Sequence, residues 1–157
     1  MSRRPWRHES APGTDAMYLF DTDFVVELFR GRLCAGADAR LHGVPVAQQH
    51  ICSVTLSELV YGARRTARPA HHLRLIETVL LPCVHVVTFD AAAAYVAGAL
   101  RARLEDCGQP LSFPDLQIAA MAMANDLALV TGNTRHFARI PGLRLENWLE
   151  DGECGKR

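Results

Sequence analysis

Three acidic residues stand where an apolar segment gives way to a helix-forming one. Asp21 directly follows the apolar run 18–20, and Glu58 lies roughly one helical turn beyond a second run at 51–54. Asp115 lies in the first turn of a further helix-forming segment. Ligand sites of open α/β sheets form outside the carboxyl ends of the strands. We therefore expect these carboxylates to converge on one cleft, together with polar residues that follow a later strand.

Clustered carboxylates form a site for a hard divalent cation. Mg²⁺ and Mn²⁺ take oxygen ligands, and Mg²⁺ keeps several of its waters. In phosphodiester hydrolysis such an ion activates water and offsets charge on the leaving oxygen. Without metal, neighbouring carboxylates repel one another, which raises the pKa of at least one of them. The pattern is thus compatible with metal-dependent hydrolysis of a phosphodiester.

Each of these acids, taken alone, also fits a structural role. Segments 55–58 and 112–115 both resemble the capping box that begins a helix, and Asp21 or Asp23 is placed to cap the first helix. Acids in a first helical turn also gain from the helix dipole. Sequence spacing alone does not decide, for any of these residues, whether it caps a helix or binds a metal ion.

A different chemistry is suggested by Asp21-Thr22-Asp23. A hydrophobic strand that ends in Asp-x-Asp resembles the aspartyl-phosphate phosphatases of the haloacid dehalogenase superfamily. There the first Asp would be the nucleophile and the second an acid/base. That superfamily also needs a lysine in its site, and the only lysine here is Lys156, near the end of the sequence. The lysine requirement weighs against this alternative.

The order of predicted elements indicates the fold class. Apolar and β-branched runs alternate with segments of helical spacing, which is typical of βαβ units with a parallel sheet and helices on both faces. We therefore predict an α/β fold with three α/β/α layers and a mostly parallel central sheet. Residues 32–50 are loop-like or weakly helical. The predicted strands cover 18–20, 51–54, 84–88, 127–131 and 143–145, and the predicted helices cover 23–29, 55–65, 69–81, 91–104 and 114–125.

Length and composition favour one soluble domain. The chain has 157 residues, which suits a single core. We divide it into a disordered extension (1–16), one folded domain (17–150) and a tail (151–157). No uncharged run approaches the ~18 residues of a membrane span, and the basic start has no apolar stretch after it. The predicted location is the cytoplasm.

The cysteines and the basic residues are less informative. None of the five cysteines forms a C-x-x-C pair, and Cys52, Cys83 and Cys107 lie in or beside apolar runs, so we expect core thiols in a reducing compartment. The formal net charge is +0, so a nucleic-acid surface must be local. A basic stretch follows Glu58, and Arg64 and Arg65 are the candidate phosphate contacts. A solvated helix face is the alternative.

Four segments, in order, resemble the PIN-domain family and within it the VapC-type toxins. The resemblance extends from Met17 to about Glu150. Each motif is weak alone, but four at fitting separations are specific. They are 18–23, 53–63, 114–120 and 129–137, the last followed by 140–143.

The resemblance implies a Mg²⁺-dependent endoribonuclease, with Mn²⁺ as an alternative ion. Asp21, Glu58 and Asp115 match the acidic metal-site positions of the family. The neighbouring polar residues would orient ligands and waters, and the substrate would be structured RNA such as tRNA. A cognate DNA-binding antitoxin would cover the cleft, and the toxin would form a homodimer. The orienting residues are Thr22, Asp23, Thr131 and Asn133.

Three positions depart from the family pattern. Asp23 stands where Asn is usual, and Asn133 stands where many members have Asp. His136 stands where an acidic residue often precedes a Phe, which is Phe137 here. A fourth acidic corner is therefore in doubt, and we expect one tightly held ion. A catalytically weak module that binds RNA or protein is the alternative function.

Overall fold

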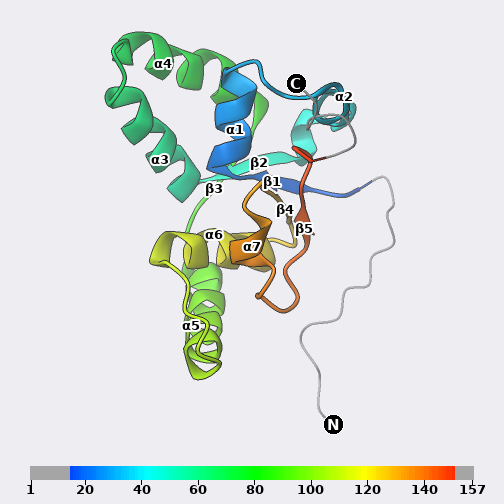
Figure 1. Cartoon of the computed structure of the whole chain (residues 1–157), viewed down its shortest axis with the longest axis vertical. Coiled ribbons are helices and arrows are strands. Elements are labelled where there is room, and N and C mark those ends of the chain that lie inside the picture. Colours follow the sequence, from blue (N-terminus) through cyan, green and yellow to red (C-terminus); the bar gives the residue numbers. More distant parts are fainter. Residues whose placement is uncertain (1–14, 151–157) are drawn as a thin grey trace.

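A five-stranded parallel sheet forms the centre of the molecule (Figure 1). The computed structural model describes residues 15–150. All recorded strand pairings in this range are parallel, which confirms the predicted α/β class. The strands, in the order β3-β2-β1-β4-β5, are β1 (Tyr18–Phe20), β2 (Gln49–Cys52), β3 (His85–Val87), β4 (Ala128–Val130) and β5 (Leu145–Glu146).

Helices cover both faces of the sheet. In Figure 1 the N-terminal helices lie on one side and α5, α6 and α7 on the other, which gives the predicted three layers. The helices are α1 (Thr22–Phe29), α2 (Ala35–Gly43), α3 (Ser53–Arg64), α4 (Pro69–Leu75), α5 (Ala91–Asp106), α6 (Phe113–Ala124) and α7 (Thr134–Phe137). Short helical turns at 46–48, 76–80 and 81–83 connect them.

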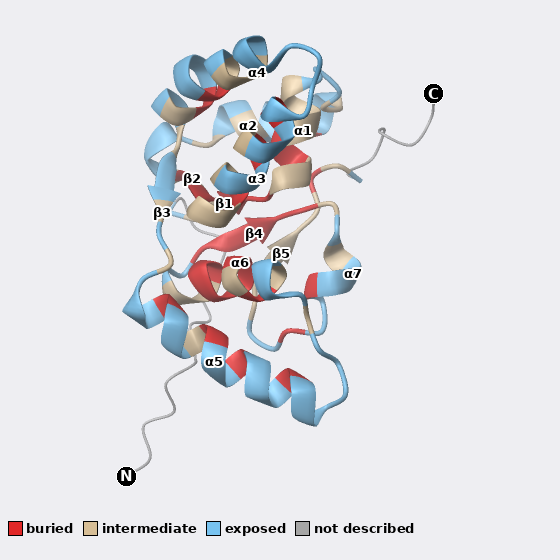
Figure 2. Cartoon of the chain, turned by 90° about the vertical axis from the view of Figure 1, so that its left-hand side faces the viewer, coloured by how far each residue is buried: buried red, intermediate tan, exposed pale blue. Residues whose placement is uncertain are grey.

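Successive side chains of the central strands pack into two separate hydrophobic cores. Leu19 packs with α5 and α6, whereas its neighbour Phe20 packs with α1 and α3. All three residues of β4 are buried, as expected for a strand covered on both faces. Figure 2 shows the buried residues concentrated at the sheet and α6, while α4 and α5 expose most of their surface.

The strand order places a crevice between β1 and β4. From β1 the chain continues to β2 and β3, which lie on one side of β1 in the sheet. It then crosses to β4, which lies on the other side of β1. Ligands bind at such a reversal, outside the carboxyl ends of the strands. Asp21 follows β1 and Thr131 follows β4, so both border this crevice.

Some predicted boundaries were wrong. β2 ends at Cys52 and α3 begins at Ser53, with the Cys52 thiol accepting from the Thr55 N–H at 3.4 Å. The capping-box interpretation of 55–58 is therefore wrong, because Cys52 already caps the helix. Part of the weakly patterned stretch 32–50 forms α2.

The predicted thiols also need correction. Cys52 is buried as expected, but Cys83 and Cys107 are exposed because they lie at the surface ends of helical turns. Cys34 is disulfide-bonded, so the expectation of reduced thiols is wrong at this residue. The predicted extension 1–16 and tail 151–157 lie outside the described residues, apart from Asp15 and Ala16. Between residues 15 and 150, none of the helices has the length and apolar character needed to cross a membrane.

Candidate active site

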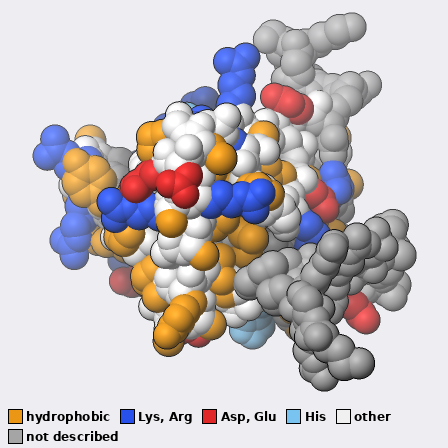
Figure 3. All heavy atoms as spheres, turned by 90° about the horizontal axis from the view of Figure 1, so that it is seen from below, with side chains coloured by type: hydrophobic (Ala, Val, Ile, Leu, Met, Phe, Trp, Pro, Cys, Tyr) orange, Lys and Arg blue, Asp and Glu red, His pale blue; other side chains and the backbone are white. Residues whose placement is uncertain are grey.

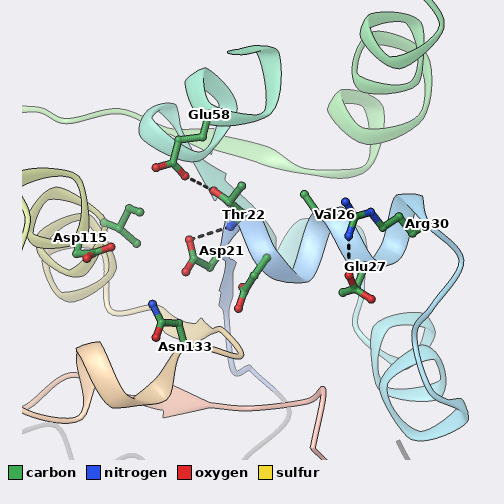
Figure 4. A pocket seen from close by; sticks show the side chains of 10 residues that line it. Asp21, Thr22, Val26, Glu27, Arg30, Glu58, Asp115 and Asn133 are labelled. Carbon is green, nitrogen blue, oxygen red and sulfur yellow. Dashed lines mark hydrogen bonds and ion pairs between the residues drawn. The ribbon is translucent and has the colours of Figure 1, made fainter. Parts of the chain in front are cut away.

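A cavity of about 430 Å³ opens at the carboxyl ends of the strands (Figure 4). All three predicted carboxylates line it, although they come from segments far apart in the sequence. The cavity thus brings together the site that the sequence predicted. Its lining residues are Asp21, Thr22, Asp23, Val26, Glu27, Arg30, Glu58, Asp115, Ile118 and Asn133.

Asp21 sits at the base of the cavity, between the end of β1 and the start of α1. Its side chain is 8% exposed. One carboxylate oxygen accepts from the Thr22 N–H at 2.8 Å, which makes Asp21 the N-cap of α1. The other oxygen accepts from the Thr131 hydroxyl at 3.0 Å. The capping prediction is therefore confirmed, and the same residue also lines the cavity.

The electrostatic environment of Asp21 disfavours a bare negative charge. Burial, together with the nearby charges of Asp23 and Glu58, raises its pKa to about 6. The hydrogen bonds from Thr22 and Thr131 act in the opposite direction but do not cancel the shift. A cation in the cavity would offset this repulsion.

Glu58 approaches from the other side of the cavity. It lies in the second turn of α3 and is exposed. The hydroxyl of Thr22 donates a hydrogen bond to its Oε2, and Figure 4 shows the two side chains pointing toward each other. Thr22 therefore connects Glu58 to the start of α1, directly beside Asp21.

Asp115 is held at the start of α6. Ser112 caps this helix, and its hydroxyl accepts from the Asp115 N–H at 3.3 Å and lies 2.7 Å from Asp115 Oδ2, to which it donates. The capping prediction for 112–115 is confirmed. His136 Nδ1 lies 3.5 Å from the same oxygen. Asp115 Oδ1 is left without a recorded partner among the described residues.

Asp23, the extra acid, is largely engaged by the backbone. Its carboxylate accepts from the N–H groups of Phe24 and Gly132, each at 2.7 Å. It lines the cavity but also bridges α1 to the segment after β4. Because both carboxylate oxygens of Asp23 accept hydrogen bonds from backbone N–H groups, these bonds compete with direct binding of a metal ion by Asp23.

The remaining polar residues surround the carboxylates. Thr131 is fully buried beneath the cavity, where its hydroxyl donates to Asp21 and accepts from the Asn133 N–H at 3.0 Å. Asn133 reaches the cavity itself. Arg64 and Arg65 do not line it. They lie further along α3, at its C-terminal end.

Sequence reasoning missed two features of the site. One is the contact of His136 with Asp115, because only the fold brings α7 beside α6. The other is the extension of the cavity along α1, past Val26 to the Glu27–Arg30 ion pair. The helical spacing of these residues from Asp23 was a usable indication, because residues three, four and seven apart share a face.

The donor set fits a hard divalent cation. Within residues 15–150 no three His, Cys, Asp or Glu side chains are drawn together closely enough to enclose an ion directly. Yet the cavity carries carboxylate, hydroxyl and amide oxygens, and Mg²⁺ commonly keeps waters between itself and the protein. Burial and the nearby carboxylates raise the pKa of Asp21, and a cation beside it would stabilise its ionised form. The residues therefore fit an ion held partly through water.

Comparisons with known proteins identify the family of the chain. Residues 18–143 match the PIN domain family. The chain is 44% identical, over 98 residues, to the tRNA(fMet)-specific endonuclease VapC of Shigella flexneri, covering 62% of this chain and 74% of that protein.

Two solved structures share the fold. One is the DNA-bound VapBC of Salmonella typhimurium, with a TM-score of 0.77, 32% identity and coverage of 85% of this chain and 98% of the other. The second is VapBC2 of Rickettsia felis bound to a DNA fragment from their promoter, with a TM-score of 0.77, 29% identity and coverage of 84% and 98%.

Proposed function

The chain belongs to the PIN-domain family and, within it, to the VapC proteins, and on this basis we propose that it is the toxin of a toxin–antitoxin pair and cuts RNA with the help of Mg²⁺ or Mn²⁺. The supporting observation is the placement of Asp21, Glu58 and Asp115 around one cavity. Membership of this family sets aside the haloacid dehalogenase alternative.

The residues of the cavity have distinct roles in this proposal. Asp21, Glu58 and Asp115 hold the ion, directly or through waters. When bound, the ion would activate a water molecule and offset charge on the leaving oxygen. Thr22 and Thr131 fix the orientation of Glu58 and Asp21 through their hydroxyl groups.

The polar rim of the cavity completes the site. Asp23 fixes the segment that carries Asn133, and the Asn133 amide orients a ligand or a water molecule. Arg64 and Arg65, further along α3, contact phosphates of the RNA outside the cavity.

The proposed substrate is structured RNA, in particular tRNA. This rests on the relative that is named a tRNA(fMet)-specific endonuclease. The site of action would be the cytoplasm, where tRNA is available.

The proposed protein partner is a cognate antitoxin. Both solved structures described above are VapBC complexes bound to DNA, and the chain aligns with nearly the full length of their matched chains. A basic side chain from such a partner would be attracted to the acidic cavity, so association should slow at high salt.

A second copy of the chain is proposed to cover α5. This helix packs on α6 and leaves a row of small residues and Tyr95 exposed, with Tyr95 85% accessible. Figure 3 views this end of the molecule and shows hydrophobic side chains at the surface beside charged ones. A contiguous apolar surface of this kind is typical of an interface, and most homo-oligomers are closed dimers.

The proposed activity is tested by incubating antitoxin-free protein with total RNA and purified tRNA, with Mg²⁺, Mn²⁺ or chelator. Asp115→Asn is the variant and Asp106→Asn, an exposed acid at the end of α5, is the matched control. We expect discrete cuts that need metal, persist in the control and disappear in Asp115→Asn. A folded protein that cuts no RNA would instead favour the binding-module alternative.

A further inference from the structure

We propose that Tyr61 and Arg65, which follow Glu58 along α3, form a platform that binds unpaired nucleotides next to the cut site. Tyr61 stacks on a base, and Arg65 contacts a neighbouring phosphate. This inference rests on the proposed function and specifies the form of RNA that the site accepts.

Helical geometry aligns the platform with the cavity. Glu58, Tyr61 and Arg65 stand at positions i, i+3 and i+7 of α3 and its C-cap. At 3.6 residues per turn these residues fall within an arc of about 60°, and they span about 10 Å along the helix axis. Glu58 lines the cavity, so the platform continues outward from it. Figure 1 shows α3 leading from the sheet toward α4.

Tyr61 is an unusual residue for a solvated helix face. Its side chain is 68% exposed, and no aromatic partner is recorded for it in the described chain. By contrast, Tyr18 packs edge-on against Trp148 with ring centroids 5.0 Å apart. An exposed aromatic ring offers a flat surface on which any base stacks, whatever its identity.

The arginines beside Tyr61 lack acidic partners. Arg64, Arg65 and Arg68 have no carboxylate oxygen within 4.0 Å anywhere in residues 15–150. Elsewhere Arg30, Arg101 and Arg144 form ion pairs with Glu27, Glu105 and Asp126. The end of α3 therefore carries uncompensated positive charge, which favours phosphate.

An aromatic ring among unpaired arginines favours unpaired nucleotides over a duplex. Bases within a double helix are stacked on one another, so a side chain reaches their faces only in loops, bulges or ends. At about 3.4 Å per stacked nucleotide, the 10 Å between Glu58 and Arg65 matches roughly three nucleotides. The platform thus selects a loop of a structured RNA.

RNA is a better occupant of this surface than an acidic protein segment. An acidic protein segment would pair with the arginines alone, whereas RNA also supplies bases that stack on the exposed Tyr61 ring. Loss of antitoxin or dimer contacts on changing Tyr61, with RNA binding unchanged, would overturn the proposal.

The test uses a short single-stranded RNA with 2-aminopurine at one position, titrated with protein carrying Asp115→Asn to prevent cleavage. The 2-aminopurine fluorescence falls when the base stacks. Tyr61→Leu should weaken binding about ten-fold and abolish the fluorescence loss, because stacking on an aromatic ring contributes on that scale. Tyr61→Phe, which keeps the ring, should retain both.

The contribution of the Arg65 charge to RNA binding is tested separately, with a control variant of its own. Arg65→Gln should reduce the slope of log Kd against log salt by about one, whereas Arg103→Gln on α5 should leave it unchanged. Thermal melting and light scattering confirm that each variant is folded and of unchanged oligomeric state.

The outcomes separate this proposal from the proposed function. Equal affinity and equal fluorescence loss in Tyr61→Leu would overturn the platform even if Asp115-dependent cleavage is observed. Fluorescence loss that needs the Tyr61 ring, in a protein that cuts no RNA, would support the platform and contradict the nuclease.

Discussion

The carboxylate of Asp23 accepts a hydrogen bond from the backbone N–H of Gly132, with 2.7 Å between the oxygen and the nitrogen. This contact ties the first turn of α1 to the segment after β4, and it thereby fixes the point at which Asn133 enters the cavity.

Gly132→Ala is expected to destabilise the protein. A Cβ at this position would lie 2.9 Å from Asp23 Oδ2 and 3.0 Å from Leu149 Cδ1. Because the Asp23 carboxylate is held by backbone N–H groups, relieving the clash should cost about 1–3 kcal/mol, as overpacking typically does. Urea denaturation measures the loss.

The matched control is Gly62→Ala on α3. No atom lies within 4 Å of a Cβ added there, so the change should raise stability by up to about 1 kcal/mol through helix propensity. Equal stability of the two variants would contradict the tight approach of Asp23 to Gly132.

The stability of the metal-free protein should fall as the pH rises from about 4 to about 6. The pKa of Asp21 is raised from 3.8 to about 6 by burial and by nearby carboxylates. Between these values the folded state binds more protons than the unfolded state, so stability decreases with pH. The loss of stability is at most ~3 kcal/mol, and it is complete above the pKa of Asp21 in the folded state.

Asp21→Asn should remove this pH dependence. In chelator at pH 7 the variant should melt higher than the wild type, whereas Asp106→Asn should not. A variant that melts lower, or an unchanged pH profile, would show that the Asp21 carboxylate is not destabilised by its surroundings. The same proton competes with metal, so ion affinity should also weaken below about pH 6.

Ser112→Ala should affect both the fold and the ion. Ser112 caps α6 and donates to Asp115 Oδ2 at 2.7 Å. Loss of the cap costs about 1 kcal/mol, and the freed Asp115 should bind metal several-fold more weakly. Ser112→Thr, which keeps a hydroxyl, should restore both quantities. Metal affinity that is unchanged in Ser112→Ala would show that Ser112 does not position Asp115.

Tyr95→Glu should convert the proposed dimer to a monomer. Tyr95 is 85% exposed on the apolar face of α5, and a buried unpaired charge at an interface is costly. Light scattering coupled to size-exclusion chromatography gives the mass, with Tyr95→Phe as the control. A wild-type protein that is monomeric at all concentrations would contradict the interface.

Much of the fold could be predicted because the sequence pattern follows the period of each element. The run 18–20 and the all-buried β4 carry continuous apolar residues, and α5 and α6 fall within a few residues of their predicted bounds. The start of α3 was misplaced because a cysteine caps it, and cysteine is not a usual cap. Segment 32–50 has too weak a periodicity to reveal α2.

The convergence of Asp21 and Glu58 could be predicted because they follow β1 and β2, whose carboxyl ends lie side by side in the sheet, whereas Asp115 lies at the start of α6, which follows a helix and not a strand. Whether each carboxylate stabilises a helix start or binds a ligand could not be decided from the sequence. Asp21 and Asp115 both take part in the capping of a helix and also line the cavity. The approach of His136 to Asp115 depends on how α7 packs beside α6, which spacing along the chain does not encode.

A calorimetric titration of Mn²⁺ and Mg²⁺ into antitoxin-free protein tests the central claim most directly, namely that Asp21, Glu58 and Asp115 share one ion. The wild type and the Asp106→Asn control should each bind one ion per chain, and Asp115→Asn should lose that binding. Identical binding by Asp115→Asn, or two equivalent tight ions in the wild type, would contradict the single shared site.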